Sequence, residues 1–243
     1  MVMKSEFGPE KMRRFLRYEL DQYLRGRTTE RKKELPLLRV ENQDYVHYRK
    51  GSLVMYALQD YIGEWALNQA LARYIQAVAF HGPPYTTSAE LLAYLREVTP
   101  DQYKYVLEDM FETITLYDNR AIKAAYTPRP DGKYEVRLHT QSKKLRADPL
   151  GKEQEVPLND FIDIGVLDAK GNAIYLQKER IDRSEMEFSI VVDQLPAKAG
   201  IDPLNKLIDR KPDDNSIKVS RESAEDKRPS ARSGPAADRS ADR

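Results

Sequence analysis

The feature that most constrains this fold is a change of hydrophobic period near Tyr126. Upstream of it, apolar residues recur at helical spacing, whereas downstream they alternate with polar ones, most clearly over 134–140 and 186–192. Alternation of this kind is typical of antiparallel strands with one buried face. The sequence therefore predicts an α+β fold, with an N-terminal α-helical array over residues 1–125 and a small antiparallel β-sandwich-like domain over residues 126–218.

Local signals divide the helical part into several short helices. A first apolar stripe ends near Gly26, and Gly63 breaks the chain between two further helices. Thr87 and Glu90 have the spacing of a capping box, in which each side chain bonds the other residue's backbone N–H. A last helix carries its buried side as far as Ile114. Together these signals indicate paired short helices without a repeat of fixed length.

Charge and composition argue against several classes of function. Forty basic and thirty-nine acidic side chains give a net charge of +1, which argues against a general nucleic-acid or membrane-surface binder. No cysteine is present, so the chain has neither disulfides nor thiolate metal sites. No apolar run approaches the roughly 18 residues of a spanning helix, and we expect no direct membrane insertion. Residues 219–243 have almost nothing to bury, and we expect a disordered tail there.

The most informative short stretch runs from Asp44 to Gly51 and reads Asp-Tyr-Val-His-Tyr-Arg-Lys-Gly. It leads into an apolar helix and places two tyrosines, a lysine and a glycine at the predicted mouth of that helix. A phenol and backbone N–H groups at the positive end of a helix stabilise developing negative charge. This stretch is therefore the best candidate in the sequence for a chemical site.

The word Tyr-x-Lys-Gly, followed by a helix ending in Ile62-Gly63-Glu64, resembles the aminopeptidase N and leukotriene-hydrolase family of zinc metallopeptidases. The wider run is similar to one branch, the bacterial proteins that fuse an ABC-2 transporter permease to a C-terminal aminopeptidase domain. The resemblance covers roughly residues 8 to 218. The short motifs that carry the resemblance are, in chain order, Arg17-Tyr18-Glu19-Leu20, Tyr23-Leu24-Arg25-Gly26-Arg27, Tyr48-Arg49-Lys50-Gly51, Ala199-Gly200-Ile201-Asp202-Pro203 and Leu207-Ile208-Asp209-Arg210.

The resemblance implies a role for each residue of the Tyr-x-Lys-Gly stretch. In that family the tyrosine of the word lies opposite the zinc and donates a hydrogen bond to the tetrahedral oxyanion, and the matching residue here is Tyr48. Tyr45, Lys50 and Gly51 would then lie at the rim of the substrate cleft. The substrate class implied is a peptide, cleaved at its N-terminus.

The chain departs from the family pattern at the metal. The family binds zinc through H-E-x-x-H on one helix and a glutamate on the next, with the first glutamate as general base. His47, His81 and His139 are the only histidines, no two are four residues apart, and H-E-x-x-H does not occur. We therefore expect no metal ligands and no cofactor in this chain, which alone should be inactive. The zinc would come from an upstream zinc-binding half of the same protein or from a partner in trans.

Structural interpretations stand beside these functional ones. Tyr45 fits simple packing as well as it fits a cleft rim. Lys50 and Arg49 fit a solvated surface, and Gly51 fits a close approach of its helix to the upstream half.

Two further groups of charged residues are interpreted structurally. The aspartates between Asp202 and Asp214 lack the alternate spacing of a calcium loop, so turn-forming and salt-bridging roles are favoured. Lys143, Lys144 and Arg146 are interpreted as a solvated loop between strands.

A second class of function stays open, namely a non-catalytic interaction or regulatory module of a bacterial ABC-type transport system. In either case we expect a soluble domain, cytoplasmic or membrane-associated through a missing upstream part. If that part normally covers the stripe of Phe15, Leu16, Leu20 and Val54, its absence leaves apolar surface uncovered. We then expect association, partial disorder of residues 1–45, or a partner in trans.

Overall fold

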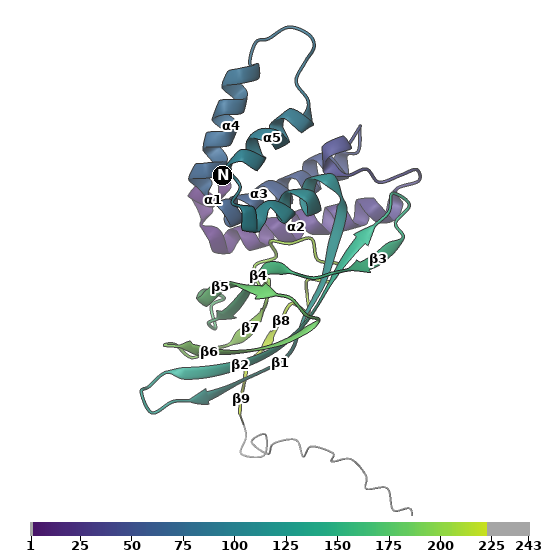
Figure 1. The fold of residues 1–243 in the computed structure, drawn as a ribbon. Coiled ribbons are helices and arrows are strands. Elements are labelled where there is room, and N and C mark those ends of the chain that lie inside the picture. Colours follow the sequence, from purple (N-terminus) through teal and green to yellow (C-terminus); the bar gives the residue numbers. More distant parts are fainter. Residues whose placement is uncertain (1, 223–243) are drawn as a thin grey trace, which may run out of the picture.

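The computed structural model describes residues 2–222 and has the predicted α+β fold, with helices in the N-terminal half and two sheets in the C-terminal half (Figure 1). Within the described residues no helix has the length and apolar character needed to cross a bilayer. In chain order the helices are α1 (Val2–Phe7), α2 (Pro9–Thr29), η1 (Leu37–Arg39), η2 (Tyr45–Lys50), α3 (Gly51–Ile62), α4 (Glu64–Val78), α5 (Ser88–Val98), η3 (Asp101–Tyr103), α6 (Lys104–Leu107) and η4 (Glu108–Glu112).

The strands form two sheets whose apolar faces meet in one core. One sheet has the order β3-β2-β1-β9, with β6 also paired to β2, and the other has the order β5-β4-β7-β8. All neighbours are antiparallel except β1 and β9, which confirms the predicted antiparallel character. The strands are β1 (Ile114–Pro128), β2 (Tyr134–Ala147), β3 (Glu153–Val156), β4 (Asp160–Leu167), β5 (Ala173–Ile181), β6 (Glu185–Val192), β7 (Lys198–Ile201), β8 (Ser216–Lys218) and β9 (Ser220–Arg221).

The first long helix, α2, is buried along its apolar stripe. Leu16 and Leu20 are fully buried, as is Val54 on α3, and Phe15 is partly buried. α2 packs against both η2 and α3, which together cover the stripe. The expectation of an uncovered stripe and of partial disorder over residues 1–45 is therefore wrong for the described residues of that segment, because the chain's own helices fill that surface.

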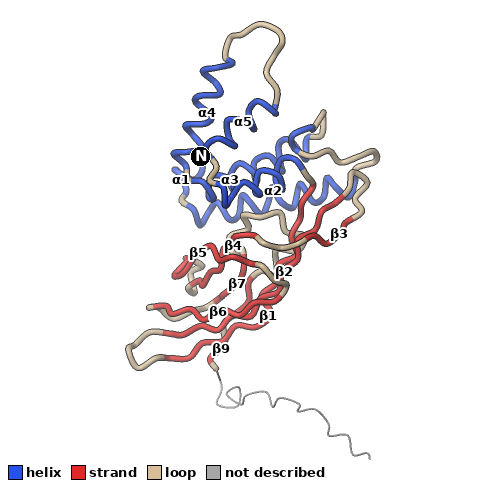
Figure 2. The backbone as a smooth tube through the Cα atoms, in the orientation of Figure 1, coloured by secondary structure: helices blue, strands red, loops and turns tan. Residues whose placement is uncertain are grey.

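Two of the local helix signals are confirmed. Gly63 separates α3 from α4 and has a φ of +86°, a conformation that favours glycine. The Thr87–Glu90 capping box is present, with the Glu90 N–H donating to Thr87 Oγ1 at 3.4 Å and the Thr87 N–H donating to Glu90 Oε2 at 3.2 Å. In the hairpin of α4 and α5 that follows, Leu67 and Leu95 are buried in the core, and the far end of the hairpin, with the loop between the helices, stands away from the rest of the molecule (Figure 2).

The change from helix to strand lies earlier than the period of the sequence indicated. The helices end at Glu112 and β1 begins at Ile114, whereas the helical part was expected to extend to residue 125. The reason is that residues 114–117 are all buried, so both faces of this part of β1 are covered and no alternation is visible.

One ion-pair network joins α3 to the β half. Asp60 on α3 pairs with Lys178 and with Lys206, the latter at 2.6 Å from Nζ to Oδ1. Asp163 on β4 accepts from the same two lysines, at 3.0 and 2.7 Å. Because each lysine is shared between a helix and a sheet, this network fixes the two halves against each other.

A second network joins η4 to both sheets and corrects an expectation. Lys144 on β2 is buried and pairs with Asp109 on η4 and with Asp160 on β4, the latter at 3.0 Å. Arg146 pairs with Asp109 at 2.8 Å. Lys143, Lys144 and Arg146 were expected in a solvated loop, but all three lie within β2, and Lys144 points into the core.

The described chain ends as part of the first sheet rather than as a tail. Val219 is buried, and its N–H donates to the carbonyl of Ala197 at 3.0 Å. Glu222 pairs with Arg137 at 3.2 Å. The expected disordered tail from residue 219 is therefore wrong for residues 219–222, because Val219 is buried, β9 pairs with β1, and the Glu222 N–H donates to the carbonyl of Tyr126. The remainder of that prediction, residues 223–243, lies outside the described residues.

Candidate functional site

Tyr48 lies on a wide helical turn that continues into α3 without a break. η2 is a π-helical turn, a form that occurs often at functional sites. The Gly51 N–H donates to the carbonyls of Tyr48 and Val46, so the helix runs through the glycine. The expected helix mouth at Gly51 is therefore wrong, and this N–H is bonded within the helix instead of being available to an oxyanion.

The Tyr48 side chain projects from this turn into solvent. It is 68% exposed, and its ring contacts that of His47 at 4.4 Å between centroids. Nε2 of His47 lies 3.6 Å from Oδ1 of Asp44. Among the described residues none forms a hydrogen bond with the Tyr48 hydroxyl. The phenol is thus free to donate a hydrogen bond to an external group.

The next residue, Arg49, is held by α2. Its Nη1 donates to both carboxylate oxygens of Glu19, at 3.1 and 3.3 Å, and its guanidinium lies 5.7 Å from the ring of Tyr18. Glu19 is buried although it is acidic. The pair therefore anchors the turn that carries Tyr48 onto α2, beside the exposed ring of Tyr18. The sequence offered a signal for it, since Glu19 is a charged residue on the buried stripe of α2.

Lys50 was expected at the cleft rim or in solvent, and the structure contradicts both. It is fully buried, donates from Nζ to the carbonyl of Thr113 at 3.3 Å, and lies 5.7 Å from the ring of Tyr23. Burial lowers the pKa of Lys50 to about 8, with Glu34 opposing that shift and Arg27 adding to it. The physical reason is that η2 turns this side chain inward, into the space between α2 and the start of β1.

The buried amine of Lys50 predicts a pH dependence of stability. Because its pKa falls from 10.5 to about 8 on folding, the unfolded chain binds more protons between these values and stability rises with pH there. The rise amounts to roughly 3 kcal/mol. We expect Lys50→Met to remove most of it, measured as the free energy of unfolding in urea at pH 7 and pH 10, with the exposed Lys32→Met as control. Equal slopes for Lys50→Met and the unaltered protein would contradict this prediction.

Tyr45 is packed into the fold. Its ring stacks on that of Tyr23, with centroids 6.1 Å apart, and its hydroxyl donates to Glu30 at 3.2 Å. Burial, followed by the charges of Glu34 and Glu30, raises the pKa of Tyr45 above its ordinary value. This geometry matches the packing interpretation more closely than a cleft rim.

The close approach expected at Gly51 occurs at Gly26 instead. A Cβ on Gly26 would lie 2.4 Å from Cβ and Cγ of Tyr45, whereas a Cβ on Gly51 would meet its nearest neighbour, Leu37 Cδ1, at 3.7 Å. Gly26 therefore stays inside α2, which continues to Thr29 instead of ending near the glycine. Its role is to let the Tyr45 ring lie against the helix.

These two helical glycines form a matched pair for a test. We expect Gly26→Ala to destabilise the protein by about 1–3 kcal/mol, because the added methyl forces Tyr45 away. We expect Gly51→Ala to leave stability unchanged or raise it by up to about 1 kcal/mol, because alanine favours helix and has room. Urea unfolding of both variants measures the difference. A Gly26→Ala variant as stable as Gly51→Ala would show that the close approach of Tyr45 to Gly26 does not contribute to the free energy of unfolding.

The aspartates after Asp202 have the structural roles predicted for them. Asp202 accepts the N–H groups of Lys206 and Leu207, at 2.9 and 3.0 Å. Asp209 accepts those of Asn119 and Lys211, and Asp213 pairs with Arg17 at 2.6 Å. Turn-forming and salt-bridging roles are thus confirmed. Within residues 2–222, no group of three or more His, Asp or Glu side chains has the geometry to hold a metal.

A small hollow lies on the same helical face as Tyr18. It has a volume of about 340 Å³, and Phe7, Lys11, Arg14 and Tyr18 contribute to its lining. Phe7 and Tyr18 are exposed, and Lys11 and Arg14 have no acidic partner among the described residues. This face is therefore apolar and basic, and it is suited to contact with another segment of protein.

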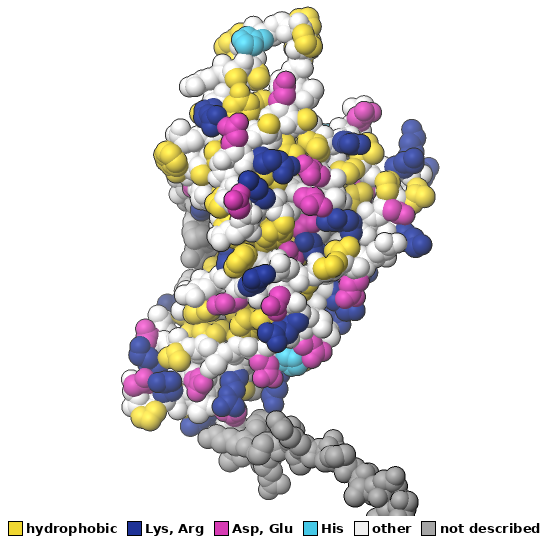
Figure 3. Space-filling view, in the orientation of Figure 1, with side chains coloured by type: hydrophobic (Ala, Val, Ile, Leu, Met, Phe, Trp, Pro, Cys, Tyr) yellow, Lys and Arg dark blue, Asp and Glu magenta, His cyan; other side chains and the backbone are white. Residues whose placement is uncertain are grey.

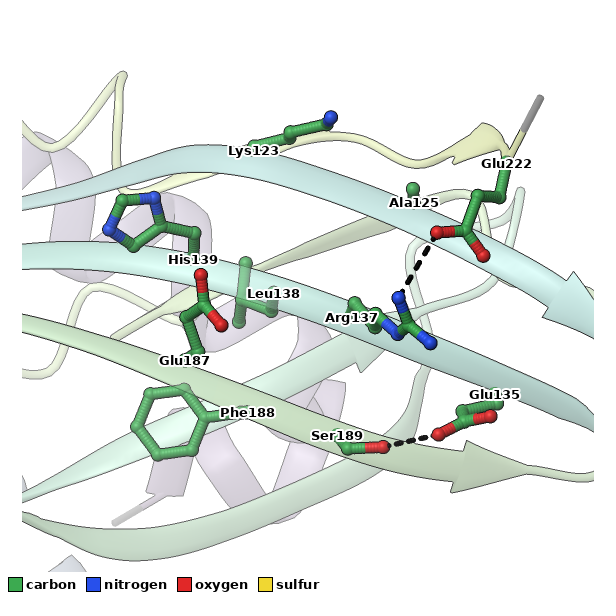
Figure 4. A pocket seen from close by; sticks show the side chains of 10 residues that line it. All are labelled: Lys123, Ala125, Glu135, Arg137, Leu138, His139, Glu187, Phe188, Ser189 and Glu222. Carbon is green, nitrogen blue, oxygen red and sulfur yellow. Dashed lines mark hydrogen bonds and ion pairs between the residues drawn. The ribbon is translucent and has the colours of Figure 1, made fainter. Parts of the chain in front are cut away.

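A second cavity, on the outer face of the first sheet, has a different character (Figure 4). Its volume is about 480 Å³, and its walls come from β1, β2, β6 and Glu222. Arg137 pairs with Glu222 there at 3.2 Å, and Ser189 donates to Glu135 at 2.7 Å. Acidic and basic groups alternate across this face and bond to one another, as on a solvated sheet surface. It lies in the β half, away from the helices that carry Tyr48.

The structure thus leaves Tyr48 exposed on a turn that Arg49 ties to the buried Glu19 of α2, while Lys50 and Tyr45 are packed into the fold. Gly51 lies at the junction with α3. Searches with this sequence found no matching protein-family model and no similar curated protein.

Proposed function

We propose that this chain is the C-terminal part of a zinc-dependent aminopeptidase, in which Tyr48 is the oxyanion-stabilising residue. The observation that supports the proposal is the state of that phenol. It is exposed, it has no hydrogen-bond partner in the described part of the chain, and its neighbours Val46 and Lys50 are buried and hold the turn in place. A preorganised donor of this kind stabilises negative charge as it develops on the substrate oxygen.

The described residues do not fit a zinc site. Among them Asp44 is the one potential ligand beside His47, and three protein ligands are the usual minimum for catalytic zinc. The zinc ligands and the general base therefore belong, in this proposal, to an upstream half or to a partner in trans. In this proposal the partner would be received by the hollow around Phe7 and Tyr18, where exposed rings lie beside Lys11 and Arg14, which have no acidic partner among the described residues.

The proposal is tested by joining the chain to its natural upstream sequence and measuring hydrolysis of aminoacyl amides. We expect Tyr48→Phe to lower kcat by about 10²–10³-fold with little change in KM, because the lost hydrogen bond acts in the transition state. Tyr85→Phe, which alters another exposed tyrosine, in the loop between α4 and α5, is the matched control and should keep full turnover. A Tyr48→Phe enzyme with unchanged kcat would remove the assigned role.

A second candidate function is a non-catalytic interaction module of an ABC-type transport system. The hollow lined by Phe7, Lys11, Arg14 and Tyr18 favours it, since a docking face requires no chemistry. The upstream reading frame distinguishes the two. An in-frame H-E-x-x-H with a later glutamate supports the enzyme, and a start codon with neither supports the module. Stoichiometric zinc in the purified chain alone would contradict the proposed division of the site.

A further inference from the structure

The hairpin of α4 and α5 ends in a segment without charge. From Tyr74 to Ala89 the sequence contains no Asp, Glu, Lys or Arg, although 33% of the whole chain is charged. No other stretch of the sequence is uncharged over such a length. An uncharged segment that also exposes large apolar side chains is a candidate contact surface.

The segment is nonetheless the most exposed part of the helical half. All residues from 80 to 90 are exposed, and the three large apolar side chains at the tip are 106% (Phe80), 76% (Tyr85) and 57% (Ile75) exposed. Figure 3 shows hydrophobic, uncharged and histidine atoms at the tip, with acidic and basic atoms beginning lower on the hairpin. We use the name aromatic tip for the end of the hairpin that carries the two exposed rings, Phe80 and Tyr85, together with the exposed Ile75 beside them.

The aromatic tip is presented by a defined structure. Tyr74 and Thr86 share a hydrogen bond of 3.0 Å between their hydroxyls, and Thr86 also donates to Glu90. The ring of Tyr74 packs against that of Tyr94 at 5.8 Å. Phe80 has a φ of +63°, which a bulky residue rarely adopts. The backbone that points this ring outward is therefore in an unfavourable conformation, which the rest of the loop must hold in place. The two ends of the loop are thus tied together behind the exposed rings.

Charge returns immediately behind the tip. Glu90 lies in the first turn of α5, and Arg73 pairs with Glu97 at 2.7 Å further along the hairpin. The hairpin is therefore layered along its length, from exposed rings through uncharged polar groups to paired charges. A lipid–water interface has the same order, from acyl chains through headgroups to water.

We propose that the aromatic tip docks the protein on a lipid bilayer, with Phe80 and Tyr85 inserted among the headgroups of zwitterionic lipids. Aromatic side chains prefer this depth, and tyrosine does so because it is apolar at one end and polar at the other. The tip has no lysine or arginine, so attraction to anionic lipid contributes nothing. The contact is peripheral and is independent of the catalytic role proposed above.

The shape of the tip favours a membrane over a protein groove or a second copy. It is convex and stands clear of the body of the molecule (Figures 2 and 3). A rigid partner would need a matching cavity, whereas headgroups rearrange around an inserted ring. A cavity of about 440 Å³ beside the tip is lined in part by His81, Tyr85 and Glu90 and faces the inner side of the hairpin.

Sedimentation of the full chain with phosphatidylcholine vesicles tests the proposal. We expect binding at millimolar lipid that is unchanged by high salt, and a partition coefficient at least ten-fold lower for the Phe80→Ser, Tyr85→Ser double variant. The control is Leu150→Ser with Leu195→Ser, which removes two exposed apolar side chains from the β half, 75% and 56% exposed. Far-UV circular dichroism and thermal melting verify that both variants fold.

A spectroscopic reporter makes the test specific to depth. Trp65 is the only tryptophan, so a Trp65→Phe, Phe80→Trp variant places a single indole at the tip. Its emission should shift to the blue with vesicles and be quenched by brominated lipid.

Four results would overturn the proposal. They are absence of vesicle binding, equal losses in the tip and control variants, binding only to anionic vesicles and only at low salt, and a tip-dependent dimer in lipid-free solution without vesicle binding.

Discussion

Replacing Lys144 by methionine is expected to destabilise the protein by about 3–5 kcal/mol. Lys144 is buried between Asp109 and Asp160, so its removal leaves two carboxylates in the core with only Arg146 still paired to one of them. The loss should shrink at low pH, because protonation discharges the unpaired carboxyls. Burial already raises the pKa of Asp160, with Lys144 opposing that shift.

Lys143→Met is the matched control, since it is the neighbouring residue on the same strand. Its ion pair with Glu155, 3.1 Å long, is solvent-exposed on both sides and should contribute less than about 1 kcal/mol. Chemical denaturation of both variants at pH 7 and pH 4 measures the contrast. Similar losses in the two variants would mean that the buried network does not hold η4 to the sheets.

Gly200→Ala is expected to cost at least about 3 kcal/mol and to lower the yield of folded protein. A Cβ at this position would lie 2.0 Å from the carbonyl oxygen of Asn215 and 2.7 Å from Cα of Ser216. Both atoms belong to the backbone, so relief requires the segment leading into β8 to move away from β7 and break its pairing. Thermal melting and hydrogen exchange of β7 and β8 amides measure the effect.

Gly82→Ala provides the comparison for that prediction. Gly82 has nothing within 4 Å of its added Cβ, and we expect a change within about 0.5 kcal/mol. If Gly200→Ala melted at the same temperature as Gly82→Ala, the close contact between β7 and β8 would have no role in stability.

The parts of the fold that follow from local chemistry could be predicted from the sequence. The capping box at Thr87, the break at Gly63 and the strands with one buried face all have a spacing that tertiary structure preserves. The start of β1 could not, because residues 114–117 are buried on both faces and give no period. The position of Lys144 failed for a related reason, since a lysine inside a strand gains its partners only from segments far along the chain.

In the candidate site, too, some positions could be predicted from the sequence and others could not. That Tyr48 lies on an accessible helical turn agrees with the expectation from sequence, although its role remains a proposal. Lys50 was expected at the cleft rim or in solvent because lysines are seldom buried. Its buried position depends on Tyr23 and Thr113, which lie far from it in the sequence. The close approach was expected at Gly51, and it occurs at Gly26 because the ring of Tyr45, which is distant in the sequence, lies against that glycine.

The hydrogen bond from Lys50 to the carbonyl of Thr113 has a mechanical consequence for the tyrosine two residues earlier. It links the turn that carries Tyr48 to Thr113, the residue before β1. The position of the phenol is therefore fixed relative to β1. In the proposed enzyme, whose site would combine this chain with an upstream half, this attachment would keep Tyr48 in a constant position relative to the opposing residues.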